Sequence, residues 1–275
     1  VIDLNSDGEI QISEAAGFND TIVLPKYGDV TDITGIEEFI SITGLNCNKN
    51  WGIHSIDLSN NTELKYLDCH VTYINSLYLN NNTKLEYLDC KYCAIETLDI
   101  GDNTSLKFIS CAANNIEYLE LDSLIELEYL DCSHNIIIDL DVSNNINLEY
   151  LRCDGIPDLY FLNLENCPKL RILSSHHSNL LELDLSQNLM LEHLSVYENE
   201  IEELDLSQNP ALTFIDCSRN ELTELNVKNG NNTNITEFDA VVNNLTCIQV
   251  DDYTYSSTHW FNIDTYTLFK EDCTE

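Results

Sequence analysis

Residues 127–147 read LEYLDCSHNIIIDLDVSNNIN, and this stretch decides the fold. It contains the apolar pattern LxxLxL twice, once from Leu127 and again about half a repeat later from Ile137. The same double pattern recurs along the chain every 21 residues, with one spacing of 22. Such self-similarity at a fixed period is the signature of a repeat architecture. The first register starts at Leu64, Leu85, Leu106, Leu127, Leu148, Leu170, Leu191 and Leu212, and the second at Ile53, Ile74, Ile95, Ile116, Ile137, Leu159, Leu180, Ile201 and Leu222.

The pattern predicts short strands. Alternate residues of a strand face opposite sides, so the fourth and sixth positions of LxxLxL point inward and the third and fifth point outward. Each coil therefore contributes two strands to two parallel sheets, and stacked coils bury a continuous core that one coil cannot bury alone. We expect a β-rich solenoid of about ten coils with very little helix.

Asparagine recurs five residues after the fourth position in both registers. Asn side chains bond to nearby backbone, so stacked columns of them would satisfy polar backbone groups at the bends. The two columns comprise Asn61, Asn82, Asn103, Asn145, Asn188 and Asn209, and Asn50, Asn114, Asn135, Asn199 and Asn220.

Composition excludes several functional classes. The chain has 275 residues, 43% of them hydrophobic, and a formal net charge of −36. This charge repels phosphate backbones and anionic lipid, which argues against nucleic-acid or acidic-membrane partners. No apolar run is long enough to span a bilayer, so we expect no membrane insertion. The sequence opens at Val1 without a Met or a signal-type apolar segment, and we interpret it as a trimmed piece.

The eleven cysteines sort by repeat position. Seven occupy the inward sixth position and are interpreted as small buried hydrophobes rather than a metal ladder. These are Cys47, Cys69, Cys90, Cys111, Cys132, Cys153 and Cys217. Cys93 and Cys167 replace Asn in the bend columns. Cys247 and Cys273 flank the last segment, and a disulfide between them would close a C-terminal cap in an oxidising compartment.

An N-terminal loop matches a calcium-binding pattern. Asp3 to Glu14 read DLNSDGEIQISE, which fits the twelve-residue EF-hand loop, with Gly8 at the sharp turn. We expect one structural calcium ion that ties the first coil, and the alternative is a turn without metal. The ligands would be Asp3, Asn5, Asp7, the Glu9 carbonyl, a water near Gln11 and a bidentate Glu14.

The outward third position of the first register carries an aromatic stripe, where we expect function to lie. Aromatic rings beside polar neighbours suit protein hot spots or stacking on sugar rings. The alternative is that the rings pack on one another along the sheet with no ligand. The predicted face comprises Tyr66, Tyr87, Phe108, Tyr129, Tyr150, His193 and Phe214, with Ile172 interrupting it.

Other exposed columns carry less information. The second register places acidic residues such as Asp57, Asp99 and Asp141 at its fifth position, which predicts a solvated acidic ladder. Several His, among them His70, His176 and His177, lie on or near the aromatic face, but no motif fixes a metal or acid/base site. No phosphate loop or catalytic motif occurs, and we expect no enzymatic activity.

The combined pattern LxxLxCxxNxLxxLDLxxN resembles the leucine-rich repeat family, specifically the nested 21-residue class called IRREKO, common in secreted proteins of Bacteroidetes-type bacteria. The match covers roughly residues 20–245 and departs from the Asn column at Thr72, Leu124, Ile156 and Ser178, and from the Cys column at Ser175 and Val196. The last segment is similar to the C-terminal caps of these proteins, and the first loop resembles the lone dockerin-like loops found in them.

We therefore predict a calcium loop and N-cap over residues 1–19, a solenoid over 20–245 and a cap over 246–275. The resemblance implies a secreted or cell-surface recognition or adhesion module of a bacterium. A protein partner bound through the aromatic face is the first hypothesis. The alternatives are a neutral polysaccharide, a structural spacer in a larger surface protein, or a homodimer contact.

Overall fold

The computed structural model describes residues 9–28 and 30–274, which form two compact units divided between residues 135 and 136. Each unit is a stack of coils, and the leucine-rich β-solenoid has about twelve turns in all, with little helix. The predicted number of about ten coils was too low, because further coils extend the stack beyond the stretch with the regular LxxLxL pattern. At the N-terminal end β1 (Thr21–Val23) pairs with β2 (Gly44–Asn46), so the coils begin before the first regular LxxLxL repeat.

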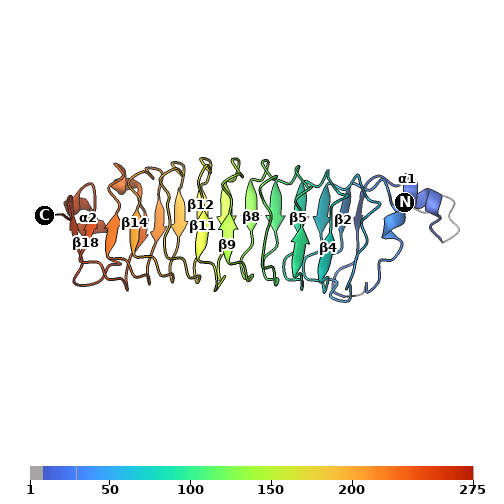
Figure 1. Cartoon of the computed structure of the whole chain (residues 1–275), viewed down its shortest axis with the longest axis horizontal. Coiled ribbons are helices and arrows are strands. Elements are labelled where there is room, and N and C mark those ends of the chain that lie inside the picture. The colour runs from blue at the N-terminus through green and yellow to red at the C-terminus, as the bar shows by residue number, and fades with distance from the viewer. Residues whose placement is uncertain (1–8, 29, 275) are drawn as a thin grey trace. The chain divides into compact units, whose positions relative to one another are not determined.

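One face of each unit is a parallel sheet, which we call the front sheet. Its strands are three residues long and pair in register, so equivalent repeat positions such as Tyr66 and Tyr87 lie side by side. Figure 1 shows these strands as neighbouring arrows. In the first unit they are β1, β2, β3 (Tyr66–Asp68), β5 (Tyr87–Asp89), β7 (Phe108–Ser110) and β8 (Tyr129–Asp131). In the second they are β10 (Tyr150–Arg152), β12 (Ile172–Ser174), β13 (His193–Ser195), β15 (Phe214–Asp216) and β17 (Glu237–Asp239).

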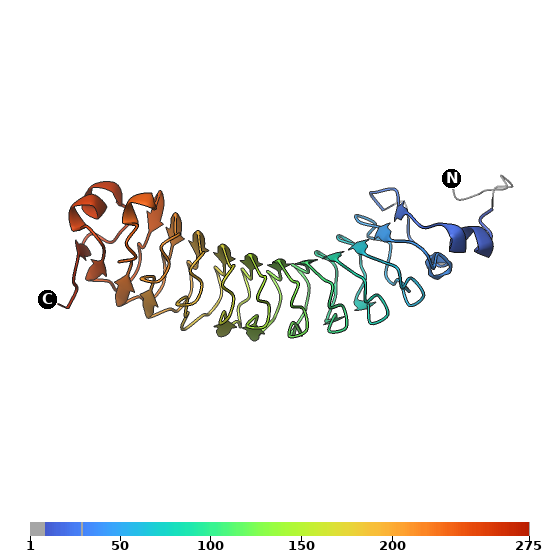
Figure 2. The same cartoon turned by 90° about the horizontal axis from the view of Figure 1, so that it is seen from above.

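The opposite side of the coils carries the second-register strands (Figure 2). The expectation of a second continuous sheet was wrong for the described residues, because these strands form separate short sheets. They are β4 (Ser76–Tyr78) with β6 (Thr97–Asp99), β9 (Asp139–Asp141) with β11 (Phe161–Asn163), and β14 (Glu203–Asp205), β16 (Glu224–Asn226), β18 (Cys247–Gln249) and β19 (Leu268–Lys270). Between them Leu119, Leu121, Leu183 and Leu185 remain buried. Side-chain packing therefore holds the back of these coils without regular strand pairing.

The Asn columns lie at the bends, as predicted. Asn82 and Asn103 are fully buried, and each Nδ2 donates to two carbonyl oxygens of the preceding coil. The second column does more, because Asn114 Nδ2 donates to Cys90 and Cys111 carbonyls while its Oδ1 accepts the Ile95 N–H. Asn243 extends this column by one coil beyond the predicted set.

The C-terminal segment is both a cap and a continuation of the solenoid. Cys247 and Cys273 form the predicted disulfide, with their Cα atoms 5.9 Å apart. Between them lie α2 (Tyr253–His259), whose N-cap Asp252 accepts two backbone N–H groups, and β19, which pairs with β18. The other helical segments are α1 (Ile12–Gly17), η1 (Ile36–Glu38) and η2 (Asn232–Asn234). No described helix has the length and apolar character needed to cross a membrane.

The cysteine column is part of the core. All seven sixth-position thiols are buried, and loss of solvent raises the pKa of Cys47 to about 12 and the pKa of Cys90 well above its ordinary value. Cys93 is the one free cysteine that is only partly buried. Its Sγ lies 3.3 Å from both Thr72 Oγ1 and the Cys69 carbonyl oxygen. A hydrogen bond from the Cys69 thiol lowers the pKa of Cys93.

We predict that a maleimide labels the folded chain once, at Cys93. The thiolate is the reactive form, so the lowered pKa of Cys93 should keep its labelling fast at pH values where a free cysteine has already slowed. Mass spectrometry of the labelled chain checks the site, and Cys93→Ser is the control that should leave the native chain unlabelled. Labelling spread over the buried column would contradict this account of the core.

Candidate functional site

The aromatic stripe of the first unit is a stacked column of rings. Tyr66, Tyr87, Phe108 and Tyr129 project from β3, β5, β7 and β8 at equivalent positions. Successive ring centroids are 4.6, 4.4 and 4.3 Å apart, and neighbouring planes differ by 15° or less. Each ring therefore covers the face of the next, because the strand spacing of about 4.8 Å is close to a stacking distance.

The second unit repeats this arrangement over a shorter length. His193 stacks on Phe214 with centroids 4.0 Å apart, while Ile172 occupies the same position on β12. Burial lowers the pKa of the His193 imidazole, which favours its neutral form. Tyr150 is half-buried on β10. The predicted face residues therefore lie in one repeat column within each unit.

Stacking leaves only the ring edges accessible. All the rings of the column are half-buried rather than exposed. Burial and the neighbouring Asp89 and Asp68 carboxylates raise the pKa of the Tyr87 phenol, so the hydroxyl at this edge stays neutral. A sugar ring stacks on an aromatic face, and these faces are already covered. The mutual packing of rings, which the sequence left as an alternative, is what the structure contains.

The fifth position beside the rings is not the solvent-facing column that the strand pattern predicts. Asp68 and Asp89 are 5% and 4% exposed, and Asp131 is 9% exposed. The side chain two residues further on covers each carboxylate: His70 Nδ1 lies 2.6 Å from Asp68, Lys91 Nζ lies 2.8 Å from Asp89, and Ser133 Oγ lies 2.7 Å from Asp131. The front sheet therefore contains a row of buried, hydrogen-bonded acids beside the rings.

The margin of the ring column carries charges of both signs. Lys65 precedes β3 and lies 3.3 Å from Glu86, which precedes β5. In the second unit Arg171 and Glu192 form the equivalent pair at 2.9 Å. These side chains are about half exposed, so the pairs contribute little stability and remain free to exchange for a partner's charges.

A second polar cluster lies at the ends of the second unit's strands. Asp154 is fully buried and accepts hydrogen bonds from Arg152 Nε, Ser174 Oγ and the His176 backbone N–H. The His176 ring stacks on Tyr197 with centroids 4.5 Å apart. His177 pairs with Glu198. These contacts satisfy the buried acid and orient the rings.

The predicted calcium loop lies mostly outside the described residues. Asp3, Asn5, Asp7 and Gly8 are among the residues not described, so their positions are not placed here. Glu9 is exposed, whereas Glu14 is 8% exposed and its Oε2 accepts the Gln11 N–H at 3.0 Å. Glu14 lies in the first turn of α1.

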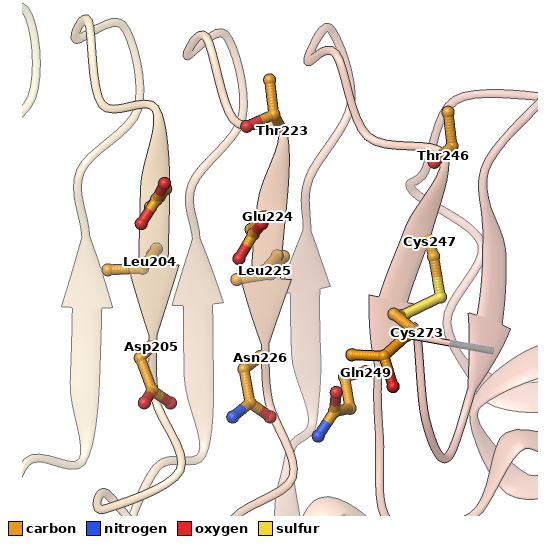
Figure 3. A pocket seen from close by; sticks show the side chains of 12 residues that line it. Leu204, Asp205, Thr223, Glu224, Leu225, Asn226, Thr246, Cys247, Gln249 and Cys273 are labelled. Atoms are coloured by element: carbon orange, nitrogen blue, oxygen red, sulfur yellow. A yellow bond between two sulfur atoms is a disulfide. The ribbon is translucent and has the colours of Figure 1, made fainter.

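A cavity of about 520 Å³ opens on the back of the second unit, beside the disulfide (Figure 3). The side chains of Asp205, Asn226 and Gln249 follow one another along one side of it. Glu203 and Glu224 add two further carboxylates. The lining is polar and acidic and lies away from the rings, so this cavity is an extension of the exposed acidic ladder rather than a shaped ligand site.

Sequence reasoning missed several exposed aromatic residues. Trp51, Tyr73, Tyr92 and Tyr118 are each about half to two-thirds exposed. Tyr92 lies in the turn after β5 with φ of 53°, a left-handed conformation that directs the side chain away from the sheet. The turn positions show no periodic hydrophobicity, so only their departure from the polar residues usual at these bends could have singled them out.

Comparison with known proteins gives no match to a family model or to a curated protein sequence. Solved structures do match. The functional domain of InlJ from Listeria monocytogenes, described as including a cysteine ladder, is 29% identical with a TM-score of 0.71 over 94% of this chain and 54% of that one. The internalin InlF of the same species is 18% identical, with a TM-score of 0.68 over 97% and 90%. YopM, an effector of Yersinia pestis, is 22% identical, with a TM-score of 0.64 over 77% and 57%.

The last two likenesses show the fold alone. The InlJ likeness adds a shared feature, since that domain is described as including a cysteine ladder and this chain contains a column of buried cysteines. This chain spans about half the length of that InlJ chain. The leucine-rich repeat solenoid is typically a non-enzymatic scaffold. From its 21-residue coils, its buried cysteine column and these likenesses, the chain is a leucine-rich repeat protein that resembles the bacterial internalins.

Proposed function

We propose that this chain is a non-enzymatic recognition module, secreted or held at a bacterial cell surface, that binds a protein partner through its front sheet. The observation that carries the proposal is the row of half-buried ring edges, bordered by exposed charges of both signs. Aromatic groups in a partly desolvated setting with a polar rim are typical of protein hot spots.

The charge distribution supports the same face. Five of the chain's twelve basic residues lie in front-sheet strands or within two residues of one, although the chain as a whole is strongly acidic. A front sheet with interspersed cations presents less repulsion to a partner than the acidic back of the coils. These residues are Lys65, Lys91, Lys107, Arg152 and Arg171.

Two features argue against the polysaccharide hypothesis. The ring faces that a sugar would stack on are covered by neighbouring rings. The acidic cavity beside the disulfide lies on the back of the second unit and has no aromatic lining. Resemblance to internalins also favours recognition of a protein.

We predict that reversing two charges at the margin of the rings removes partner binding. Lys65→Glu with Lys107→Glu changes exposed side chains beside the rings. Lys26→Glu with Lys84→Glu changes two exposed lysines elsewhere by the same net charge. Each protein is immobilised on beads and incubated with a cell-surface preparation. The wild type and the control pair (Lys26→Glu with Lys84→Glu) should retain the same partner protein, and the front pair (Lys65→Glu with Lys107→Glu) should retain at least about tenfold less of it.

Equal retention by the front and control pairs would contradict the proposed face. If the front pair still binds a glycan on a glycan array, the ligand is a sugar instead. Light scattering of the same three proteins tests whether the partner is a second copy of the chain. A melting temperature shared by the three excludes misfolding as the cause of lost binding.

We further propose that residues 3–14 bind one structural calcium ion. The support is the twelve-residue match and the position of Glu14 in the first turn of α1, since an EF-hand loop leads directly into a helix. Glu14 would supply the bidentate carboxylate.

We predict that isothermal titration with CaCl₂ finds a site that Glu14→Gln weakens by at least about tenfold, because the bidentate ligand is lost. Glu9→Gln is the matched control, since position seven of the loop contributes its carbonyl oxygen and not its side chain. Equal calcium affinity in the wild type and Glu14→Gln would show that the loop holds no ion.

A further inference from the structure

Two buried carboxylates and an imidazole converge at the end of β3. Asp68 and Asp89 are register partners on β3 and β5, and His70 follows Asp68 by two residues. Their side chains are 8%, 5% and 16% exposed respectively. Among the described residues this is the group whose carboxylate and imidazole ligand atoms all lie within 4.8 Å of one another.

The distances suit a small divalent ion. His70 Nδ1 lies 2.6 Å from Asp68 Oδ1 and 3.5 Å from Asp89 Oδ2. Ligands bound tetrahedrally to zinc at their usual bond lengths stand about 3.3 Å apart. The Asp89 oxygen is already near this separation, and the Asp68 hydrogen bond has to lengthen by less than about 1 Å.

A buried amide beside the group is only half satisfied. Asn48 is 4% exposed, and its Nδ2 donates to Asp68 Oδ2 at 2.5 Å. Its Oδ1 is buried and has no hydrogen-bond partner. Rotating the amide about its last torsion would direct this oxygen toward a cation held by Asp68, because that torsion is roughly two-fold. Such an unpaired buried acceptor is otherwise costly.

Equivalent coils show that an imidazole is not needed to satisfy the acid. Asp131 and Asp216 occupy the same repeat position, and each accepts a hydrogen bond from a serine two residues on, at 2.7 and 2.6 Å. His70 replaces that serine and also reaches the carboxylate of the next coil. The substitution therefore adds a second metal-ligating contact that the repeat itself does not require.

Lys91 is the competitor for this site. Its Nζ lies 2.8 Å from Asp89 Oδ2, and its side chain is 34% exposed, so it can turn into solvent when a cation takes its place. A dication neutralises two carboxylates better than one ammonium does, and the strongly negative chain raises the local cation concentration.

We propose that Asp68, His70 and Asp89 bind a divalent transition-metal ion of the zinc class, with Lys91 occupying the site in its absence. The nitrogen and two oxygens match a borderline ion better than calcium, which prefers all-oxygen sites. The metal makes a cross-link between two neighbouring coils beside the ring column, and it does not depend on the proposed protein partner.

The test uses the whole chain in excess CaCl₂, which occupies oxygen-only sites, titrated with ZnCl₂ against a chromophoric chelator. We expect one site whose affinity falls at least about tenfold in His70→Ala. His134→Ala is the matched control, an exposed histidine in the bend after β8 that should leave zinc affinity unchanged. Lys91→Met removes the competitor and should strengthen binding, a gain that misfolding cannot produce.

Cobalt substitution distinguishes this site from the thiols. The bound Co²⁺ should show visible bands without a sulfur-to-cobalt charge-transfer band, since no cysteine is a ligand. Equal zinc affinity in the wild type and His70→Ala, a sulfur charge-transfer band, or no gain in Lys91→Met would each overturn the assignment.

Discussion

Every coil of this molecule must satisfy its backbone at two bends that are buried by the next coil. Buried carbonyl groups that lack donors are costly, and the Asn columns supply side-chain donors in addition to the backbone N–H groups of the bends. Each amide joins its own bend to carbonyls of the coil before it, so the columns fix coil spacing and register together. The leucine and cysteine core can then form, since equivalent apolar positions are held one above another.

The same register constrains what the front sheet can do. Aromatic residues at one repeat position are brought to about the strand spacing, where they stack and cover their faces. Acidic residues at the fifth repeat position are brought equally close. Their buried carboxylates need hydrogen-bond donors, such as His70 or Lys91. The groups that remain available to contact a ligand are therefore the ring edges, the charged side chains at the margin of the ring column and the few residues that depart from the repeat.

Periodic features were predictable from the sequence, and features that depend on neighbouring side chains were not. The coils, the Asn columns and the Cys247–Cys273 disulfide follow from residue spacing. The burial of Asp68 was missed, because strand alternation gives a side chain's direction but not what covers it. The interrupted back strands and the exposed turn residue Tyr92 were missed as well, since the apolar pattern is the same with or without strand pairing and says nothing of bends.

The most direct test of this account is the unfolding free energy of Asn103→Ala, measured in urea. This change removes two buried side-chain hydrogen bonds to the Leu79 and Asn82 carbonyls, each of which keeps one backbone N–H donor, and should cost about 1–3 kcal/mol, at about 0.5–1.5 kcal/mol for each hydrogen bond. The control is Asn81→Ala, an exposed amide that bonds the Ser59 carbonyl and should cost under about 1 kcal/mol. A loss in Asn103→Ala no larger than in the control would contradict the claim that the Asn columns hold the coils together.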